Sequence, residues 1–241
     1  MRMANATVMA IAHRGASADA PENTVAAFDE AIRLGARAVE MDVRLCKDGT
    51  PVVLHDATVD RTTNGTGAVA ELTRIDLLRL DAGSWKHPRF AGTRIPLLHE
   101  ALQAVSDDAV PVLELKTEID PAVLQKLLEE FDLRGRAVIL SFDPDILKAV
   151  HARLPRIAIG LLSDGWQPEL PRMCQSLHAE ILALESGVLT VERVRAAGEY
   201  HLRVWTYTPN DAGSVAACAA IGVEGIITDH PELIRPTTKR S

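Results

Sequence analysis

The sequence predicts an α/β fold, a closed parallel (β/α)8 barrel of the TIM-barrel kind with a small inserted lobe after its second strand. Along the 241 residues, eight short apolar segments of strand type alternate with segments of helix type. Strict alternation is typical of a parallel sheet with helical crossovers, and eight units in a chain of this length suit a closed barrel. Polar residues also follow several of the strands directly, at the end where such barrels keep their active sites.

The first part of the chain supplies two barrel strands. Residues 8–12 form an apolar strand that ends at His13, and a helix begins near Asn23 and ends at Gly35. Residues 38–45 form the second strand. The segment 51–55 either pairs with it as a hairpin or continues it beyond the turn.

The segment from Asp56 to Pro96 has a different character. It is rich in Thr, Gly and charged residues and offers one short helical pattern near residues 72–80. A connection of this length without a core pattern is too long for a plain loop, so residues 56–96 are interpreted as an inserted lobe. The whole chain, residues 1–241, is otherwise expected to be one domain.

The rest of the chain is regular. Strands are expected at 110–115, 136–141, 157–162, 180–184, 202–207 and 223–228, and helices at 98–105, 121–132, 143–153, 169–177, 190–198 and 210–220. The rival fold is a doubly wound open sheet. It is disfavoured because residues 15–18, at the first strand-to-helix turn, lack a dinucleotide-binding fingerprint.

Carboxylates occupy strand positions that would ordinarily hold hydrocarbon. Side chains alternate along a strand, so Glu40 and Asp42 share one face of the second strand, and Glu114 and Lys116 share one face of the third. A solvent-exposed edge strand would also explain one such pair. Three carboxylates on two strands instead indicate an all-oxygen metal site, which favours Mg²⁺, Ca²⁺ or Mn²⁺ over zinc.

Composition excludes several classes of protein. The net charge of −7 argues against a nucleic-acid partner. Three cysteines without CxxC spacing fit neither a disulfide framework nor a zinc site, and are expected to be free thiols in a reducing compartment. The first apolar run is too short for a signal-peptide core, and no stretch reaches the length of a membrane span. A cytoplasmic protein without stable membrane insertion is therefore expected. Its expected oligomeric state is a monomer or a homodimer.

The chain resembles the glycerophosphodiester phosphodiesterase family. The resemblance rests on the order and spacing of short motifs: His13-Arg14-Gly15, Pro21-Glu22-Asn23-Thr24, Glu40-Met41-Asp42, His55-Asp56, Arg61-Thr62-Thr63, Glu114-Leu115-Lys116, Val204-Trp205-Thr206 and Thr228-Asp229-His230-Pro231. It implies a metal-dependent barrel hydrolase that splits glycerophosphodiesters into glycerol 3-phosphate and an alcohol, with one divalent cation, Mg²⁺ or Ca²⁺, or alternatively Mn²⁺.

By this resemblance each site residue receives a role. Glu40, Asp42 and Glu114 are the implied metal ligands, His13 and His55 the acid and base, and Arg14 and Lys116 the phosphate-binding cations. Trp205 is expected to border the substrate, with a core position as its alternative. Asn23 either begins a helix or supports Glu40, and Asp229 is expected to turn the chain after the last strand. Because Asp56 beside His55 could favour its protonated form, His55 is favoured as the acid.

Three other functions would use some of the same residues. A metal-assisted lyase would use the same carboxylates and a lysine but needs no pair of histidines. A phospholipase D of the sphingomyelinase type shares the barrel, but the motif at residues 21–24 and the long insertion speak against it. A non-catalytic phosphodiester-binding barrel is disfavoured because every charged position of the motifs is present.

Overall fold

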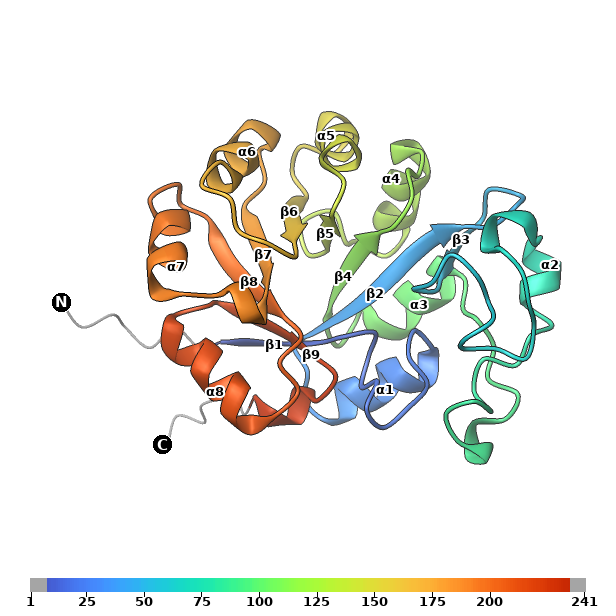
Figure 1. The fold of residues 1–241 in the computed structure, drawn as a ribbon. Helices are drawn as coiled ribbons and strands as arrows, with labels where there is room; N and C mark the ends of the chain where they lie inside the picture. Colours follow the sequence, from blue (N-terminus) through green and yellow to red (C-terminus); the bar gives the residue numbers. More distant parts are fainter. Residues whose placement is uncertain (1–7, 235–241) are drawn as a thin grey trace.

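The computed structural model describes residues 8–234 and contains the expected barrel (Figure 1). Within this range, eight parallel strands form a ring in the order β1-β9-β8-β7-β6-β5-β4-β2, which the pairing of β1 with β2 closes. The strands are β1 (Met9–Ala12), β2 (Ala38–Leu45), β4 (Val110–Leu115), β5 (Val138–Ser141), β6 (Ala158–Ser163), β7 (Ile181–Glu185), β8 (Arg203–Tyr207) and β9 (Gly225–Thr228). The fold prediction is confirmed, and the open-sheet alternative is wrong.

Helices surround the ring on its outside, as Figure 1 shows. They are α1 (Val25–Arg33), α3 (Leu98–Val105), α4 (Pro121–Glu130), α5 (Pro144–Arg153), α6 (Leu170–Leu177), α7 (Val191–Gly198) and α8 (Ala212–Ile221). Many begin with a side-chain cap, such as the hydroxyl of Thr24, which accepts from the backbone N–H of Ala27 at 3.3 Å. Across residues 8–234, no helix has the length and apolar character needed to cross a bilayer.

The alternation of β2 divides its side chains between two environments. Val39, Met41 and Val43 are fully buried in the layer between the strands and the helices. Ala38 faces the barrel interior, in a cluster to which seven other strands contribute residues such as Ile11, Val112 and Trp205. Glu40 and Asp42 share the parity of Ala38, so the strand directs both carboxylates inward.

The strand β3 (Pro51–Val53) lies outside the ring and pairs antiparallel with β2. The hairpin alternative is therefore the right one. Val53 lies opposite Val43, and the N–H of Leu54 donates to the carbonyl of Asp42 at 3.0 Å. The chain thus runs past the rim of the barrel and returns to the level of Asp42 just before His55.

The segment 56–96 lies beside β3, to one side of the barrel (Figure 1). It contains α2 (Arg74–Leu77), which is shorter than the expected helix, and the 3-10 turns Val69–Glu71 and Pro88–Phe90. Its apolar residues form a cluster separate from the two barrel clusters, namely Val59, Val69, Leu77, Ala82 and Ile95 with Cys46, Val52 and Leu54 from the β2–β3 hairpin. The segment therefore packs on the hairpin.

Candidate active site

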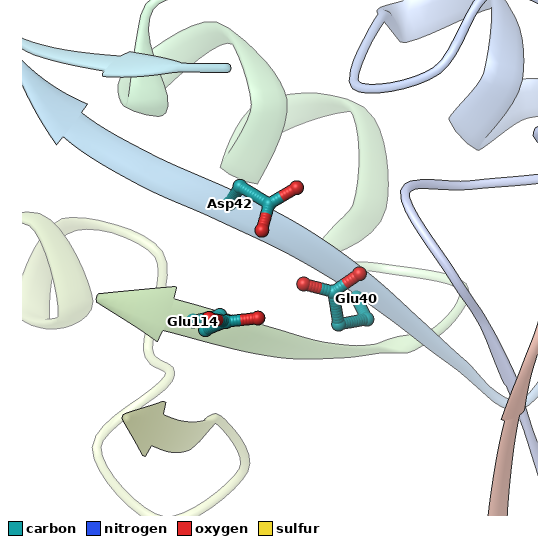
Figure 2. A group of neighbouring side chains, drawn as sticks. All are labelled: Glu40, Asp42 and Glu114. Carbon is teal, nitrogen blue, oxygen red and sulfur yellow. The ribbon is translucent and has the colours of Figure 1, made fainter. Parts of the chain in front are cut away.

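The three carboxylates predicted as metal ligands meet inside the carboxyl end of the barrel. Asp42 on β2 lies directly opposite Glu114 on β4, and Glu40 is two residues earlier on β2. Each offers an oxygen within 4.8 Å of the others, and the groups converge in Figure 2. Glu40 and Asp42 are 2% and 1% exposed, so this is a buried cluster and not the polar face of an edge strand.

Asn23 and Lys116 make direct polar contacts with the cluster. The side-chain amide of Asn23 donates to Oδ2 of Asp42 at 2.7 Å, and its carbonyl oxygen accepts from the backbone N–H of Asp42 at 3.1 Å. Nζ of Lys116 lies 3.1 Å from Oδ1 of Asp42 and also donates to Glu114. Asn23 thus supports Asp42 rather than Glu40, and Thr24 caps the helix in its place.

The charges within the cluster shift its pKa values in opposite directions. Burial, followed by the charges of Asp42 and Glu114, raises the pKa of Glu40 well above its ordinary value. Burial also acts to raise the pKa of Asp42, but the positive charges of Lys116 and Arg14 outweigh it, so that this pKa is lowered. Glu40 is therefore the carboxylate whose charge the surrounding protein compensates least.

The donor set fits a hard divalent cation. Oε1 of Glu40 is buried, and within the part of the chain that the structure describes it has no hydrogen-bond partner. A buried carboxylate oxygen without a partner is costly, and a cation bound between three carboxylates would remove that cost. Oxygen-only ligands suit Mg²⁺, Ca²⁺ or Mn²⁺.

His13 follows β1 and is paired with a carboxylate from the far end of the chain. Its Nδ1 lies 2.6 Å from Oδ1 of Asp229. Asp229 also accepts from the hydroxyl of Ser17 at 2.8 Å and from the amide of Asn210 at 2.6 Å. Burial acts to raise the pKa of Asp229, but these hydrogen bonds outweigh it and hold that pKa at about 2.

His55 has a carboxylate partner of its own. Its Nδ1 lies 2.7 Å from Oδ1 of Asp56, which binds the guanidinium of Arg61 through contacts of 2.6 and 3.1 Å. Burial lowers the pKa of His55, Arg14 and Lys116 act in the same direction, and the opposing effects of Asp42 and Asp56 do not offset this. Asp56 therefore orients the ring in addition to beginning the next loop.

Arg14 holds an uncommon backbone conformation beside the cluster. Its φ of 56° is in the left-handed region, and its backbone N–H donates to Oε2 of Glu40 at 2.9 Å. Its guanidinium donates to Glu22 at 2.7 Å and lies 3.2 Å from Asp42. Gly15 follows with a φ of 83°, and a Cβ there would stand 2.6 Å from the backbone of Ala27, so only glycine fits the turn.

Trp205 does not lie at this face of the barrel. It is 1% exposed, packs in the barrel interior and lines a cavity of about 330 Å³ with Met9, Val110 and Arg203, which stand at the amino ends of their strands. Strand β8 continues for two residues beyond Trp205, to Tyr207. Trp205 therefore lies within the strand and not at its carboxyl end, which makes it a core residue.

Two aromatic rings stand at the carboxyl ends of strands, Phe142 after β5 and Tyr207 at the end of β8. Phe142 is 43% exposed, and the two ring centroids are 6.1 Å apart in an edge-to-face arrangement. Nζ of Lys116 lies 5.9 Å from the centroid of Phe142, and the hydroxyl of Tyr207 donates to Asp164 at 3.0 Å. Unlike Trp205, these two rings stand at the carboxyl ends of their strands.

The structure adds contacts of three residues to which the sequence interpretation gave no role in the chemistry. Asp229 contacts His13, Glu22 contacts Arg14, and Arg61 contacts both Glu22 and Asp56. All three stand within motifs that carried the resemblance, but helix capping and loop formation explained each of them equally well in the sequence alone.

The comparisons with known proteins agree on one family. A sequence profile of the glycerophosphoryl diester phosphodiesterase family matches residues 13–233. The glycerophosphodiester phosphodiesterase of Caldanaerobacter subterraneus subsp. tengcongensis is 37% identical over 94% of this chain and 96% of its own.

Solved structures show the same likeness. A phosphodiesterase of Oleispira antarctica, in complex with the product sn-glycerol-3-phosphate, superposes with a TM-score of 0.89 at 31% identity, over 94% of each chain. The glycerophosphodiester phosphodiesterase of Agrobacterium tumefaciens gives 0.85 at 31% identity, over 94% of this chain and 98% of its own.

Proposed function

The chain belongs to the glycerophosphoryl diester phosphodiesterase family and has glycerophosphodiester phosphodiesterase activity, and we propose that it performs this hydrolysis with a divalent cation and two histidines. The observation that carries the proposal is the convergence of Glu40, Asp42 and Glu114. Bound there, a cation would neutralise negative charge on the phosphoryl oxygens as it grows toward the transition state.

Two cations of the chain complete the phosphate site in this proposal. The guanidinium of Arg14 and the ammonium of Lys116 both lie beside Asp42, at 3.2 and 3.1 Å. A guanidinium can bind two phosphoryl oxygens at once, whereas an ammonium acts as a compact point charge. The glycerol 3-phosphate in the Oleispira antarctica complex supports the same product for this chain.

The proton transfers are assigned to the two histidines. One ring takes the proton of the attacking hydroxyl, which belongs to water or to the 2-hydroxyl of the substrate's glycerol, as its oxygen bonds to phosphorus. The other ring gives a proton to the oxygen of the departing alcohol as its bond to phosphorus breaks. Attack by water gives glycerol 3-phosphate at once, and attack by the 2-hydroxyl gives a cyclic phosphate that water then opens.

We favour His13 as the acid and His55 as the base, the reverse of the assignment drawn from the sequence. Asp229 holds Nδ1 of His13 and has only neutral donors, Ser17 and Asn210, as its other partners. Asp56 shares its charge with Arg61, and burial lowers the pKa of His55. A ring with a lowered pKa is neutral at the working pH, as a base must be.

Phe142 and Tyr207 are proposed to border the alcohol of the substrate. The exposure of Phe142, its position next to Lys116 and its edge-to-face contact with Tyr207 support this, in place of Trp205. The lobe of residues 56–96 is proposed to shape the same pocket.

A cytoplasmic location is supported by the three cysteines, which are all buried and unpaired. Light scattering would decide between a monomer and a homodimer.

A coupled assay for released glycerol 3-phosphate tests the function. The metal-depleted protein should be inactive toward a panel of glycerophosphodiesters, and Mg²⁺, Mn²⁺ or Ca²⁺ should restore release. Unchanged turnover in the depleted protein would overturn the metal assignment. Failure to release glycerol 3-phosphate from every diester, with metal bound and the fold intact, would overturn the proposed reaction.

A further inference from the structure

Arg61 lies in the lobe and binds two carboxylates at once. Its Nε is 2.6 Å and its second terminal nitrogen 3.1 Å from the oxygens of Asp56. Its terminal nitrogens also donate to the two oxygens of Glu22, at 2.7 and 2.9 Å. One planar guanidinium thus makes two forked contacts, a geometry that an ammonium cannot reproduce.

Each of these carboxylates also holds a residue of the active site. Oε1 of Glu22 accepts from Arg14 at 2.7 Å, and Oδ1 of Asp56 lies 2.7 Å from Nδ1 of His55. A continuous chain of contacts therefore runs from Arg14 through Glu22, Arg61 and Asp56 to His55. It joins the loop after β1 to the loop after β3 across a residue of the lobe.

A purely structural ion pair is the alternative explanation for Arg61. Its side chain is 46% exposed, and exposed ion pairs contribute little to stability. The partners differ from those of an ordinary surface pair, since Glu22 is 11% and Asp56 29% exposed. Arg33 provides the comparison, because it makes a forked contact with Glu30 on α1, away from the site.

We propose that Arg61 is a positioning residue of the active site, which fixes Arg14 through Glu22 and His55 through Asp56. The lobe then completes the catalytic arrangement in addition to bordering the pocket. The inference rests on the proposed function only in that Arg14 and His55 act on the substrate; the positioning itself can be measured without turnover.

The proposal has a measurable electrostatic consequence. The charged groups around His55 are Asp42, Asp56, Arg14 and Lys116, together with Arg44, whose Nε donates to the carbonyl of His55 at 2.8 Å. Arg61 neutralises part of the charge of Asp56, so its removal should leave Asp56 freer to stabilise the protonated ring, and the pKa of His55 should rise. If Arg61 only held the lobe in place, its removal would not raise the pKa of His55 through Asp56.

The first experiment follows the ring protons of His55 by NMR during a pH titration of the Mg²⁺-saturated protein, with His55→Ala used to assign the signal. Arg61→Ala and Arg61→Gln should move the midpoint to higher pH, Arg61→Lys less, and Arg33→Ala not at all. In an Asp56→Asn background, the substitution at Arg61 should no longer move it, because the effect passes through Asp56.

The second experiment measures hydrolysis of a glycerophosphodiester across the same pH range. Arg61→Gln should lower kcat/KM by about 10- to 100-fold, the usual cost of losing a group that orients an active-site residue, and move its acidic limb to higher pH. Arg61→Lys should recover part of the loss, and Arg33→Ala should match the parent. An unmoved His55 midpoint in both Arg61→Ala and Arg61→Gln, or a shift that persists without Asp56, would overturn the proposal. Absence of turnover in the parent protein would count against the proposed function alone.

Discussion

Nδ1 of His13 lies 2.6 Å from Oδ1 of Asp229, although 216 residues separate the two in the chain. The contact exists because β1 pairs with β9, with Ala12 opposite Thr228, so that the residues directly after these strands become neighbours. Closing the barrel therefore also assembles the pair. Asp229 engages Nδ1 of the ring, so Nε2 is the nitrogen left for a substrate.

Replacing Asp229 by Asn should impair catalysis without removing the ring. A positioned acid or base contributes about 10²- to 10⁴-fold, and a misoriented ring should lose part of this, at least about tenfold in kcat with a natural diester. Steady-state kinetics would measure it, with Glu180→Asn, an exposed residue on the amino-end side of β7, as the control. A kcat equal to that of the parent would show that Asp229 does not support His13.

The same pair predicts a pH dependence of stability. The folded-state pKa of Asp229 is about 2, below the unfolded value of about 3.9. A lowered pKa means that the contribution is fully present above the unfolded value and is lost as the pH falls through the folded value. The difference in unfolding free energy between the parent and Asp229→Asn should thus shrink as the pH falls between about pH 4 and pH 2. Urea unfolding at a series of pH values would measure it, and a difference that grows on acidification would contradict the pairing.

Much of the fold and the carboxylate cluster were predictable because they depend on local patterns. Alternation along β2 and β4 was sufficient to place Glu40, Asp42 and Glu114 on inward faces. The height of a residue within the barrel is set by the stagger of the strands, which a sequence does not display, and for this reason Trp205 was assigned to the wrong end. Contacts such as those of Asp229 and Arg61 arise only when distant segments meet.

Divalent cations should stabilise the protein through Glu40. A cation at about 100 times its Kd stabilises the folded state by about 2.7 kcal/mol, so Mg²⁺ or Ca²⁺ should raise the Tm of the parent. Glu40→Gln should remove most of this increase while the metal-free protein stays folded, because the substitution removes one of three repelling carboxylates. Differential scanning calorimetry with and without cation would measure both effects. An equal increase in the parent and in Glu40→Gln would place the cation elsewhere.

Phe142 and Trp205 should respond to truncation in opposite ways. Trp205→Ala empties a buried position and should cost about 3–5 kcal/mol of stability. Phe142→Ala removes a half-exposed ring and should leave stability nearly unchanged but raise KM by about 2- to 10-fold through the lost aromatic contact. Chemical denaturation and steady-state kinetics on both variants form a matched pair. A KM effect confined to Trp205→Ala would show that Trp205, and not Phe142, borders the substrate.

The lobe should be dispensable for folding and required for activity. Its apolar cluster is separate from the two barrel clusters, so replacing residues 57–94 with a short Gly-rich connection should leave a folded barrel. Substrate affinity and turnover should both fall, because Arg61 is lost with the lobe. Circular dichroism and kinetics would test this. A protein that does not fold would show that burial of Val52 and Leu54 under the lobe is essential to the barrel.

The two histidines should be distinguishable by the leaving group. An aliphatic alkoxide leaves poorly and must be protonated as its bond to phosphorus breaks, whereas a nitrophenolate leaves without such help. His13→Ala and His55→Ala should each lose about 10²- to 10⁴-fold with a natural diester. With a nitrophenyl diester, only the variant that lacks the acid should recover substantially, and the pairing of His13 with Asp229 predicts that this variant is His13→Ala. Recovery of His55→Ala alone would reverse the assignment. Equal recovery of both variants, with metal binding and folding intact, would show that the rings do not divide the two proton transfers.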